Sequence, residues 1–201
     1  MGVTGLIKFV EAATEPGQVQ KLRGTTVAID SYCLLHKGSY CCSDKLVRAK
    51  NIQVAQFLIT SSFKVQGIKT LAYVDYIMKY IKMLKANRVR IIMVFDGMAT
   101  LSKAGTEKKR RDSRKQAKDR ARELMIAGKT EEARREFSKA VEINHEHALA
   151  LMEACRKENV DCITSMYEAD AQLAYLSKIG LVDYVISEDS DLILFGCSKI
   201  V

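Results

Sequence analysis

Four short apolar runs in this chain are each followed by acidic residues, and this pattern constrains the fold more than any other feature. The six carboxylates concerned are Asp30, Asp96, Glu168, Asp170, Asp189 and Asp191. If the runs are parallel strands, their carboxyl ends meet at the edge of the sheet where α/β folds bind ligands. Acidic side chains gathered there repel one another unless a cation lies between them, and oxygen ligands suit Mg²⁺ or Mn²⁺. The pattern therefore predicts a divalent-metal site at one edge of an α/β sheet.

Each acidic residue also has a simpler explanation. A single aspartate after a strand is most often a helix cap or a turn residue, and Asp30 alone could be only that. Asp189 and Asp191 stand two positions apart, so an extended segment points both side chains to the same side. Glu168 and Asp170 do not share a helix face and can converge only at an irregular helix start. Six such residues at four strand ends favour convergence on one pocket, where mutual repulsion would raise several of their pKa values.

Strand-like and helical segments alternate along the chain, which predicts an α/β fold with a mostly parallel central sheet flanked by helices. The expected strands are Thr25–Ile29, Arg90–Phe95, Asp161–Ile163 and Tyr184–Ser187. The expected helices are Gly2–Ala13, Ser31–Lys37, Ala72–Leu84, Ala169–Lys178 and, with a break at Gly128, nearly all of Glu107–Lys157. Within that last stretch, Glu131–Ile143 and His147–Cys155 resemble one tetratricopeptide-type hairpin. A solenoid needs about three repeats, so we interpret the stretch as an inserted helical arch.

The positive charge of the chain is concentrated in one segment. The formal net charge is +8, and the basic residues of this segment are Lys103, Lys108, Lys109, Arg110, Arg111, Arg114, Lys115, Lys118, Arg120 and Arg122. Only Glu107, Asp112 and Asp119 oppose them, so ten minus three leaves +7. A charged run on a helix is usually a solvated face, but a one-signed excess costs self-repulsion and favours a polyanionic partner. Lys103 and Arg110 are two helical turns apart, so one side of a helix presents both.

The composition argues against several other classes of protein. Six cysteines show no zinc-ligand spacing, and no histidine lies in the acidic motifs, so we expect reduced thiols in a cytosolic or nuclear protein without zinc. A secretory signal has an uninterrupted apolar core, whereas Lys8 and Glu11 interrupt the N-terminal apolar segment of this chain. No apolar run approaches the roughly 20 residues that a membrane span requires. A metal-dependent enzyme acting on a phosphate polymer is therefore the first hypothesis.

Five motifs, in this order along the chain, resemble the flap endonuclease/XPG-type 5′-nucleases. They are Met1–Leu6, Ala28–Tyr32, Val94–Gly97, Tyr167–Leu176 and Glu188–Leu192. The resemblance covers essentially the whole chain except one internal stretch. It implies a PIN-like 5′-nuclease fold with a helical arch for single strands. The implied activity is that of a metal-dependent 5′→3′ double-stranded DNA exonuclease with 5′-flap endonuclease activity, serving mismatch repair and recombination.

The resemblance also implies roles for individual residues. The six carboxylates correspond to the ligands of two Mg²⁺ ions, which Mn²⁺ can replace, and Lys103 and Arg110 correspond to a catalytic basic pair in the arch. Tyr32 and His36 match positions that meet the terminal nucleotides, and Gly2 matches a glycine near the DNA junction. From the basic run itself, we expect four further residues to contact or steer the DNA backbone: Arg114, Lys115, Lys118 and Arg122.

The expected organisation has three parts: residues 1–99 as the N-terminal nuclease region, 100–157 as the basic arch with a helical hairpin, and 158–201 as the start of the internal nuclease region. By the resemblance, a seventh acidic residue and a helix-two-turn-helix follow Val201. Arg48–Val65 is interpreted as an 18-residue insertion, either genuine or a gene-model artefact, at the edge of the protein.

The expected partners are duplex DNA with 5′ ends, nicks or flaps, and repair proteins that bind a C-terminal tail. We expect a nuclear monomer that does not bind membranes. The alternatives are a flap endonuclease proper, a catalytically incomplete DNA-binding fragment and, least favoured, a helical interaction module.

Overall fold

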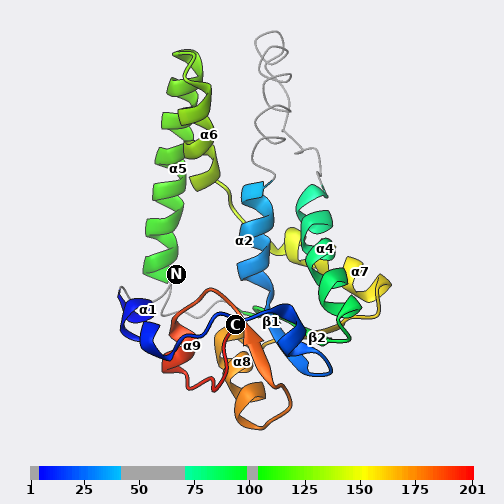
Figure 1. The fold of residues 1–201 in the computed structure, drawn as a ribbon. Coiled ribbons are helices and arrows are strands. Elements are labelled where there is room, and N and C mark those ends of the chain that lie inside the picture. The colour runs from blue at the N-terminus through cyan, green and yellow to red at the C-terminus, as the bar shows by residue number, and fades with distance from the viewer. Residues whose placement is uncertain (1–4, 42–70, 99–103) are drawn as a thin grey trace.

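The computed structural model describes residues 5–41, 71–98 and 104–201 of the chain. Three of the sequence predictions concern residues outside these ranges: the roles of Gly2 and Lys103, and the insertion at Arg48–Val65. Within the described ranges, strands alternate with helices as expected, and a hairpin of two helices stands away from the sheet (Figure 1).

The sheet of the described residues consists of four parallel strands. They are β1 (Thr26–Asp30), β2 (Arg90–Phe95), β3 (Asp161–Thr164) and β4 (Tyr184–Ile186), in the spatial order β3-β2-β1-β4. Every neighbouring pair is parallel, so all the carboxyl ends lie at the same edge. In the register of β1 with β2, Asp30 lies opposite Val94, which places Asp96 just beyond it. The predicted parallel sheet is confirmed.

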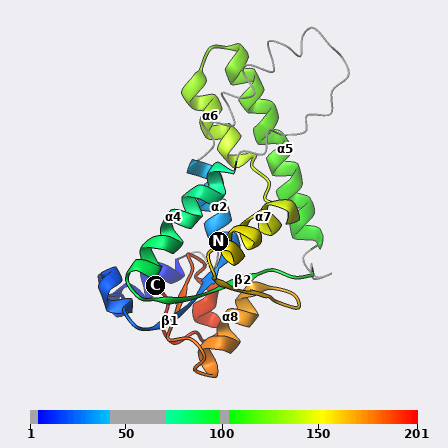
Figure 2. The same ribbon diagram turned by 90° about the vertical axis from the view of Figure 1, so that its right-hand side faces the viewer.

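Helices cover both faces of the sheet, and each face has its own apolar core. On one face, Val27 and Ile29 pack with helices α2 (Ser31–Cys41), α4 (Ala72–Ala86) and α7 (His145–Lys157). On the other face, Ala28 packs with α8 (Ala169–Lys178) and α9 (Asp191–Leu194). Figure 2 shows α2, α4 and α7 above the strands and α8 below them. Because successive strand side chains point to opposite faces, the strands are apolar at nearly every position.

The N-terminal segment forms less helix than expected. The described part contains α1 (Leu6–Phe9), followed by the 3₁₀ turns η1 (Glu11–Ala13) and η2 (Val19–Leu22), instead of one helix to Ala13. Phe9 is 85% exposed and η1 buries no residue, so this segment lacks the packed apolar face that stabilises a helix in a protein.

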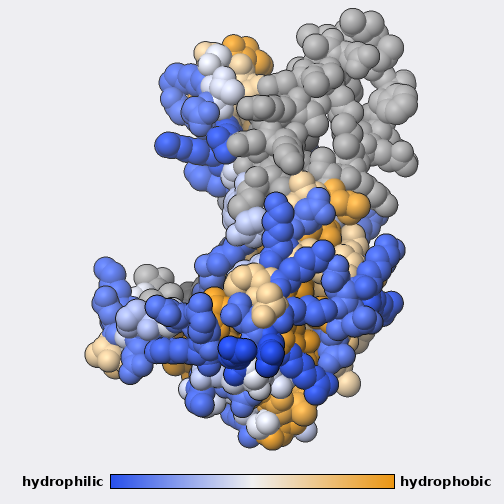
Figure 3. Space-filling view, turned by 45° about the vertical axis from the view of Figure 1, so that its right-hand side comes forward, coloured by the Kyte–Doolittle hydropathy of each residue, from blue (hydrophilic) through white to orange (hydrophobic). Residues whose placement is uncertain are grey.

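The projecting hairpin is made of α5 (Ala104–Ile126) and α6 (Thr130–Lys139). Gly128, with φ of +74°, occupies the left-handed position after α5 and turns the chain, as the sequence predicts. The two helices pack against each other, and their buried residues are small: Ala117, Ala121 and Ala133. In Figure 3, hydrophilic residues cover much of the hairpin. Within the described ranges, no helix combines the length and apolarity needed to cross a membrane.

The sequence paired α6 with α7, and the structure differs here. Helix α6 packs on α5, whereas α7 packs against α2, α4 and β3. The physical reason is the apolar stripe of α7, because Ala148, Leu151 and Cys155 are buried in the core of the sheet. A capping box between Asn144 and His147 starts α7 separately from α6.

Two leucines of α7 test this placement. Leu151 is fully buried and Leu149 is 49% exposed. Leu151→Ala should lower the free energy of unfolding by about 2–5 kcal/mol because it leaves a cavity in the core. Leu149→Ala should change it by less than about 0.5 kcal/mol. Urea unfolding followed by circular dichroism measures both, and equal losses would contradict the packing of α7 against the sheet.

Candidate functional site

Asp30, the last residue of β1, is a buried carboxylate at the centre of the sheet edge. Its Oδ1 accepts the N–H groups of Tyr32 at 3.0 Å and Cys33 at 3.2 Å, so it caps α2. Its Oδ2 accepts the hydroxyl of Ser187 at 3.0 Å, just after β4. Burial raises the pKa of Asp30 above its ordinary value, and the nearby carboxylate of Asp96 raises it further, while these hydrogen bonds oppose the rise. Asp30 therefore both caps α2 and lies close to a second carboxylate.

Asp96 follows β2 and joins it to the start of α8. Its Oδ1 accepts the N–H of Ala169 at 2.7 Å. Ala169 lies between Glu168, which has extended backbone at the N-terminal boundary of α8, and Asp170, in the first turn. Extended backbone before the first turn is the usual geometry of a helix start, so the convergence of these two side chains stays a prediction. The Asp96 side chain therefore lies at the start of α8, beside the backbone that carries Glu168 and Asp170.

Gly97 makes this meeting possible. Its N–H donates to the carbonyl of Tyr167 at 2.6 Å, and the Met98 N–H donates to Met166 at 3.0 Å. A Cβ on Gly97 would lie 2.0 Å from the carbonyl oxygen of Ser165, so no larger residue fits without moving the backbone. The close approach of these two loops holds Asp96 beside the start of α8.

The remaining two carboxylates follow β4. The N–H of Asp189 donates to Ser187 Oγ at 3.1 Å, and the N–H of Asp191 donates to Asp189 Oδ1 at 3.1 Å. Ser187 therefore connects Asp30 to this loop through its hydroxyl. The sequence analysis did not single out Ser187, although its place between the strand and the acidic pair was a signal that it could contact both.

The six carboxylates thus lie at or beyond the carboxyl ends of the strands, and we call this end of the sheet the acidic edge. Hydrogen bonds or charge interactions link several of the six residues. Their chemistry fits Mg²⁺, because the donors are all oxygen atoms. Within the described ranges, no three His, Cys, Asp or Glu side chains are arranged to hold one ion as they stand. Their role as metal ligands remains a prediction.

Tyr32 and His36 of α2 are affected by charges from two different parts of the molecule. Burial raises the pKa of Tyr32, and the charge of Asp96 adds to the rise. Burial also lowers the pKa of His36, as do the charges of Arg114 and Arg110. Tyr32 and His36 are four residues apart and share one face of α2, so this face lies near Asp96 at the start of the helix and near the arginines of α5 one turn later.

The expected DNA-contacting residues of α5 differ in their surroundings. Arg114 is only 22% exposed in its side chain and pairs with Glu107 at 3.1 Å and Glu142 at 3.3 Å. These contacts tie α5 to the segment after α6, so Arg114 has a structural partner that the sequence did not predict. Arg122 lies 3.5 Å from Asp119, and Lys115 and Lys118 are exposed.

Two buried serines provide a test of the sheet edge. The hydroxyl of Ser165 lies 2.9 Å from the carbonyl oxygens of both Phe95 and Tyr167, whereas the buried hydroxyl of Ser31 has no partner among the described residues. Ser165→Ala should lower the free energy of unfolding by about 1–2 kcal/mol. Ser31→Ala should leave it unchanged or raise it slightly, because an unsatisfied polar group is removed. Thermal unfolding of both variants should show this order, and the reverse order would refute it.

The pKa of His36 tests the position of α5 over α2. We expect NMR titration to give a pKa below 6.5, and Arg114→Gln should move it upward. Burial lowers the pKa of His147 without a contribution from these arginines, so His147 should not respond. Because the unfolded chain binds a proton at His36 more readily, stability falls as the pH drops below about 6.5. His36→Gln should flatten this part of the pH profile. An unchanged His36 pKa in the Arg114 variant would contradict the arrangement.

Comparisons with known proteins give the same grouping of motifs. The family model of the XPG N-terminal domain matches residues 1–117, and that of the XPG I-region matches residues 159–201. Exonuclease 1 of Drosophila melanogaster is 45% identical over 201 residues, which is all of this chain and 25% of that protein. The chain therefore spans about a quarter of the length of this curated relative.

Solved structures share the fold. The catalytic core of Rad2 in complex with a DNA substrate matches with a TM-score of 0.60 and 22% identity, covering 99% of this chain and 50% of that one. The Holliday junction-resolving enzyme GEN1, in complex with product DNA and a Mg²⁺ ion, matches with a TM-score of 0.54 and 18% identity, covering 99% and 36%. These matches confirm the predicted fold class.

Proposed function

This chain belongs to the XPG family, and on this premise we propose that it is the N-terminal part of a metal-dependent 5′-nuclease. The activity we propose is 5′→3′ exonuclease action on double-stranded DNA, together with cleavage of 5′ flaps. The whole-chain similarity to exonuclease 1 supports this choice within the family. The observation that carries the proposal is the set of acidic residues at or beyond the carboxyl ends of the parallel strands, next to a helix, α2, whose His36 lies near Arg110 and Arg114 of α5.

We infer that Mg²⁺ is the cofactor and that two ions bind, with Mn²⁺ able to replace them. The residues that would hold them are Asp30, Asp96, Glu168, Asp170, Asp189 and Asp191. The buried, raised-pKa carboxylate of Asp30 supports this, because it lies where nearby negative charge calls for a cation. Bound ions at such a site supply an activated water and stabilise the leaving oxygen of a phosphoryl displacement.

The side chains of α2 and α5 would bind and orient the DNA. Arg110 lies close enough to His36 to lower its pKa, and this proximity supports a shared role for the two residues at a phosphate. A cation positioned there, together with Lys103, would stabilise the charge that develops on the scissile phosphate. Tyr32 and His36 would meet the terminal nucleotides. Lys115 and Lys118, exposed along α5, would hold the backbone by charge alone.

The cellular setting follows from this activity. We propose a nuclear protein of mismatch repair and recombination whose partners are DNA with 5′ ends, nicks or flaps, and repair proteins. We expect it to act as a monomer.

Replacing Arg110 and replacing Lys118 should affect different steps, the cleavage rate and DNA binding respectively. Arg110→Ala should lower the single-turnover cleavage rate far more than it weakens DNA binding, because its interaction strengthens as the phosphoryl group transfers. Lys118→Ala should mainly weaken binding and reduce the salt dependence of the binding constant by about one unit of slope. Fluorescence anisotropy measures binding, and quenched-flow cleavage in Mg²⁺ measures the rate. Rescue of both variants by high DNA concentration would contradict the division of roles.

The substrates decide between the proposed activity and its alternatives. Blunt, nicked and 5′-flap duplexes should all be cut from the 5′ end, and Asp30→Asn should abolish cutting. A strict preference for 5′ flaps would identify a flap endonuclease proper. Binding without cleavage of any substrate would identify a catalytically incomplete DNA-binding fragment.

A further inference from the structure

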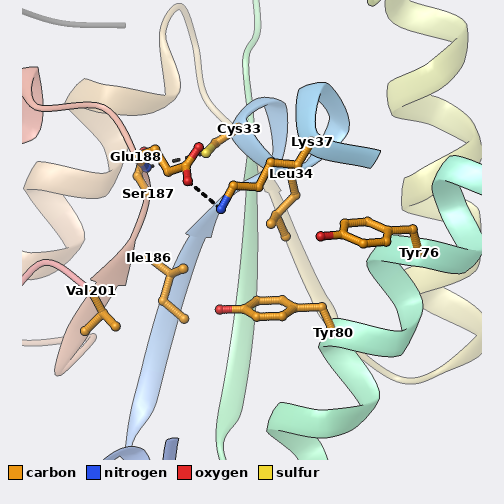
Figure 4. Close-up of a pocket in the computed structure, with 9 residues that line it drawn as sticks. All are labelled: Cys33, Leu34, Lys37, Tyr76, Tyr80, Ile186, Ser187, Glu188 and Val201. Atoms are coloured by element: carbon orange, nitrogen blue, oxygen red, sulfur yellow. Dashed lines mark hydrogen bonds and ion pairs between the residues drawn. The ribbon is translucent and has the colours of Figure 1, made fainter. Parts of the chain in front are cut away.

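Helix α2 holds Glu188, the residue directly before Asp189, at two points. Lys37 Nζ lies 2.6 Å from Glu188 Oε1, and the Glu188 N–H donates to Cys33 Sγ at 3.4 Å. Cys33 and Lys37 are four residues apart, so one face of α2 presents both. Figure 4 shows the lysine reaching across to the glutamate, with the cysteine beside it. We call these three residues the Glu188 clamp.

A cavity of about 250 Å³ lies beside the clamp. Its walls come from α2, from Tyr76 and Tyr80 of α4, and from the residues around the end of β4 (Figure 4). The space between α4 and the loop after β4 is open. Contacts from α2, rather than packing against α4, therefore hold the loop on this side.

The loop held by the clamp carries the last two acidic residues of the site. The amides of Glu188, Asp189 and Asp191 donate to Cys33 Sγ, Ser187 Oγ and Asp189 Oδ1 respectively. Ser187 in turn bonds to Asp30. A displacement of Glu188 would therefore move Asp189 and Asp191 relative to Asp30.

We propose that Lys37 is a positioning residue, which through Glu188 fixes Asp189 and Asp191 against α2. This inference deepens the proposed function and rests on it for the role of the carboxylates. The same helix carries Tyr32 and His36, so the clamp sets the distance between the acidic loop and the side chains proposed to meet DNA. Lys37 pairs with Glu188, and through this residue it acts on the carboxylates.

The chain offers a matched control for the chemistry of the clamp. Lys82 Nζ lies 3.0 Å from Glu158 Oε1, and these side chains are 61% and 37% exposed, compared with 42% and 62% for Lys37 and Glu188. Exposed ion pairs contribute little to global stability, so Lys37→Met and Lys82→Met should both unfold at nearly the wild-type temperature. Only the first removes a contact to the acidic loop.

Amide hydrogen exchange measures the position of the loop without any metal or DNA. In Lys37→Met, the amides of Glu188, Asp189 and Asp191 should exchange about fivefold faster than in the wild type, because the loop opens more often. Lys82→Met should leave them unchanged, and Lys37→Arg, which keeps the charge, should restore most of the protection. Unchanged exchange in Lys37→Met, or equal acceleration in Lys82→Met, would overturn the proposal.

The affinity for Mn²⁺, measured by electron paramagnetic resonance, tests whether the position of the loop affects metal binding by the carboxylates. Lys37→Met should need about threefold more Mn²⁺ for half-saturation, and the exchanged pair Lys37→Glu with Glu188→Lys should bind better than either single variant. Wild-type affinity in Lys37→Met would overturn the link to the carboxylates. If the wild-type chain binds no Mn²⁺, the proposed function fails at this site, while the exchange experiment still decides whether Lys37 positions the loop.

Discussion

The structure depends on one buried carboxylate. Asp30 ends the central strand, caps α2 through two backbone N–H groups and accepts the hydroxyl of Ser187 beyond β4. A carboxylate that is 8% exposed has lost most of its hydration, and the hydrogen bonds offset only part of that loss. Its raised pKa shows that the charge is incompletely compensated. The same group that joins strand, helix and loop therefore also carries a charge that the cation of the proposed metal site would offset.

The same acidic residue can cap a helix and bind a ligand, because the two roles can use different oxygen atoms. Asp96 accepts an N–H at the start of α8, and Asp189 accepts one at the start of α9. In both cases the carboxylate is fixed by one oxygen, and helix starts favour negative charge through the orphan N–H groups. A residue held in this way loses little further freedom when it binds an ion. Capping thus prepares the carboxylates for the role that the resemblance assigns to them.

The sequence was sufficient for the sheet and for the location of the acidic edge, because short continuous apolar runs and the acidic residues that follow them are local signals. It was not sufficient for the packing of α7. The sequence pattern of this helix matched a hairpin with α6, whereas Leu151 and Cys155 are buried in the core against the sheet. Nor could it show that Arg114 pairs with Glu142 as well as with Glu107, since Glu142 lies 28 positions away in the sequence. Ser187, Gly97 and Lys37 act through contacts that exist only once distant strands are neighbours. Contacts between residues that are distant in the sequence cannot be predicted from a short segment, whereas the pattern of apolar residues within that segment can be read directly.

The strand order has a consequence for the folding of the chain during its synthesis. β1 is made early, but one of its two neighbours is β4, and the bond from Ser187 to Asp30 spans 157 positions. A ribosome that adds about 5–20 residues per second would deliver β4 roughly 8–30 s after β1. During that interval the central strand has an unpaired edge, which is a template for wrong pairing. The nascent chain is therefore most exposed to aggregation before β4 emerges from the ribosome.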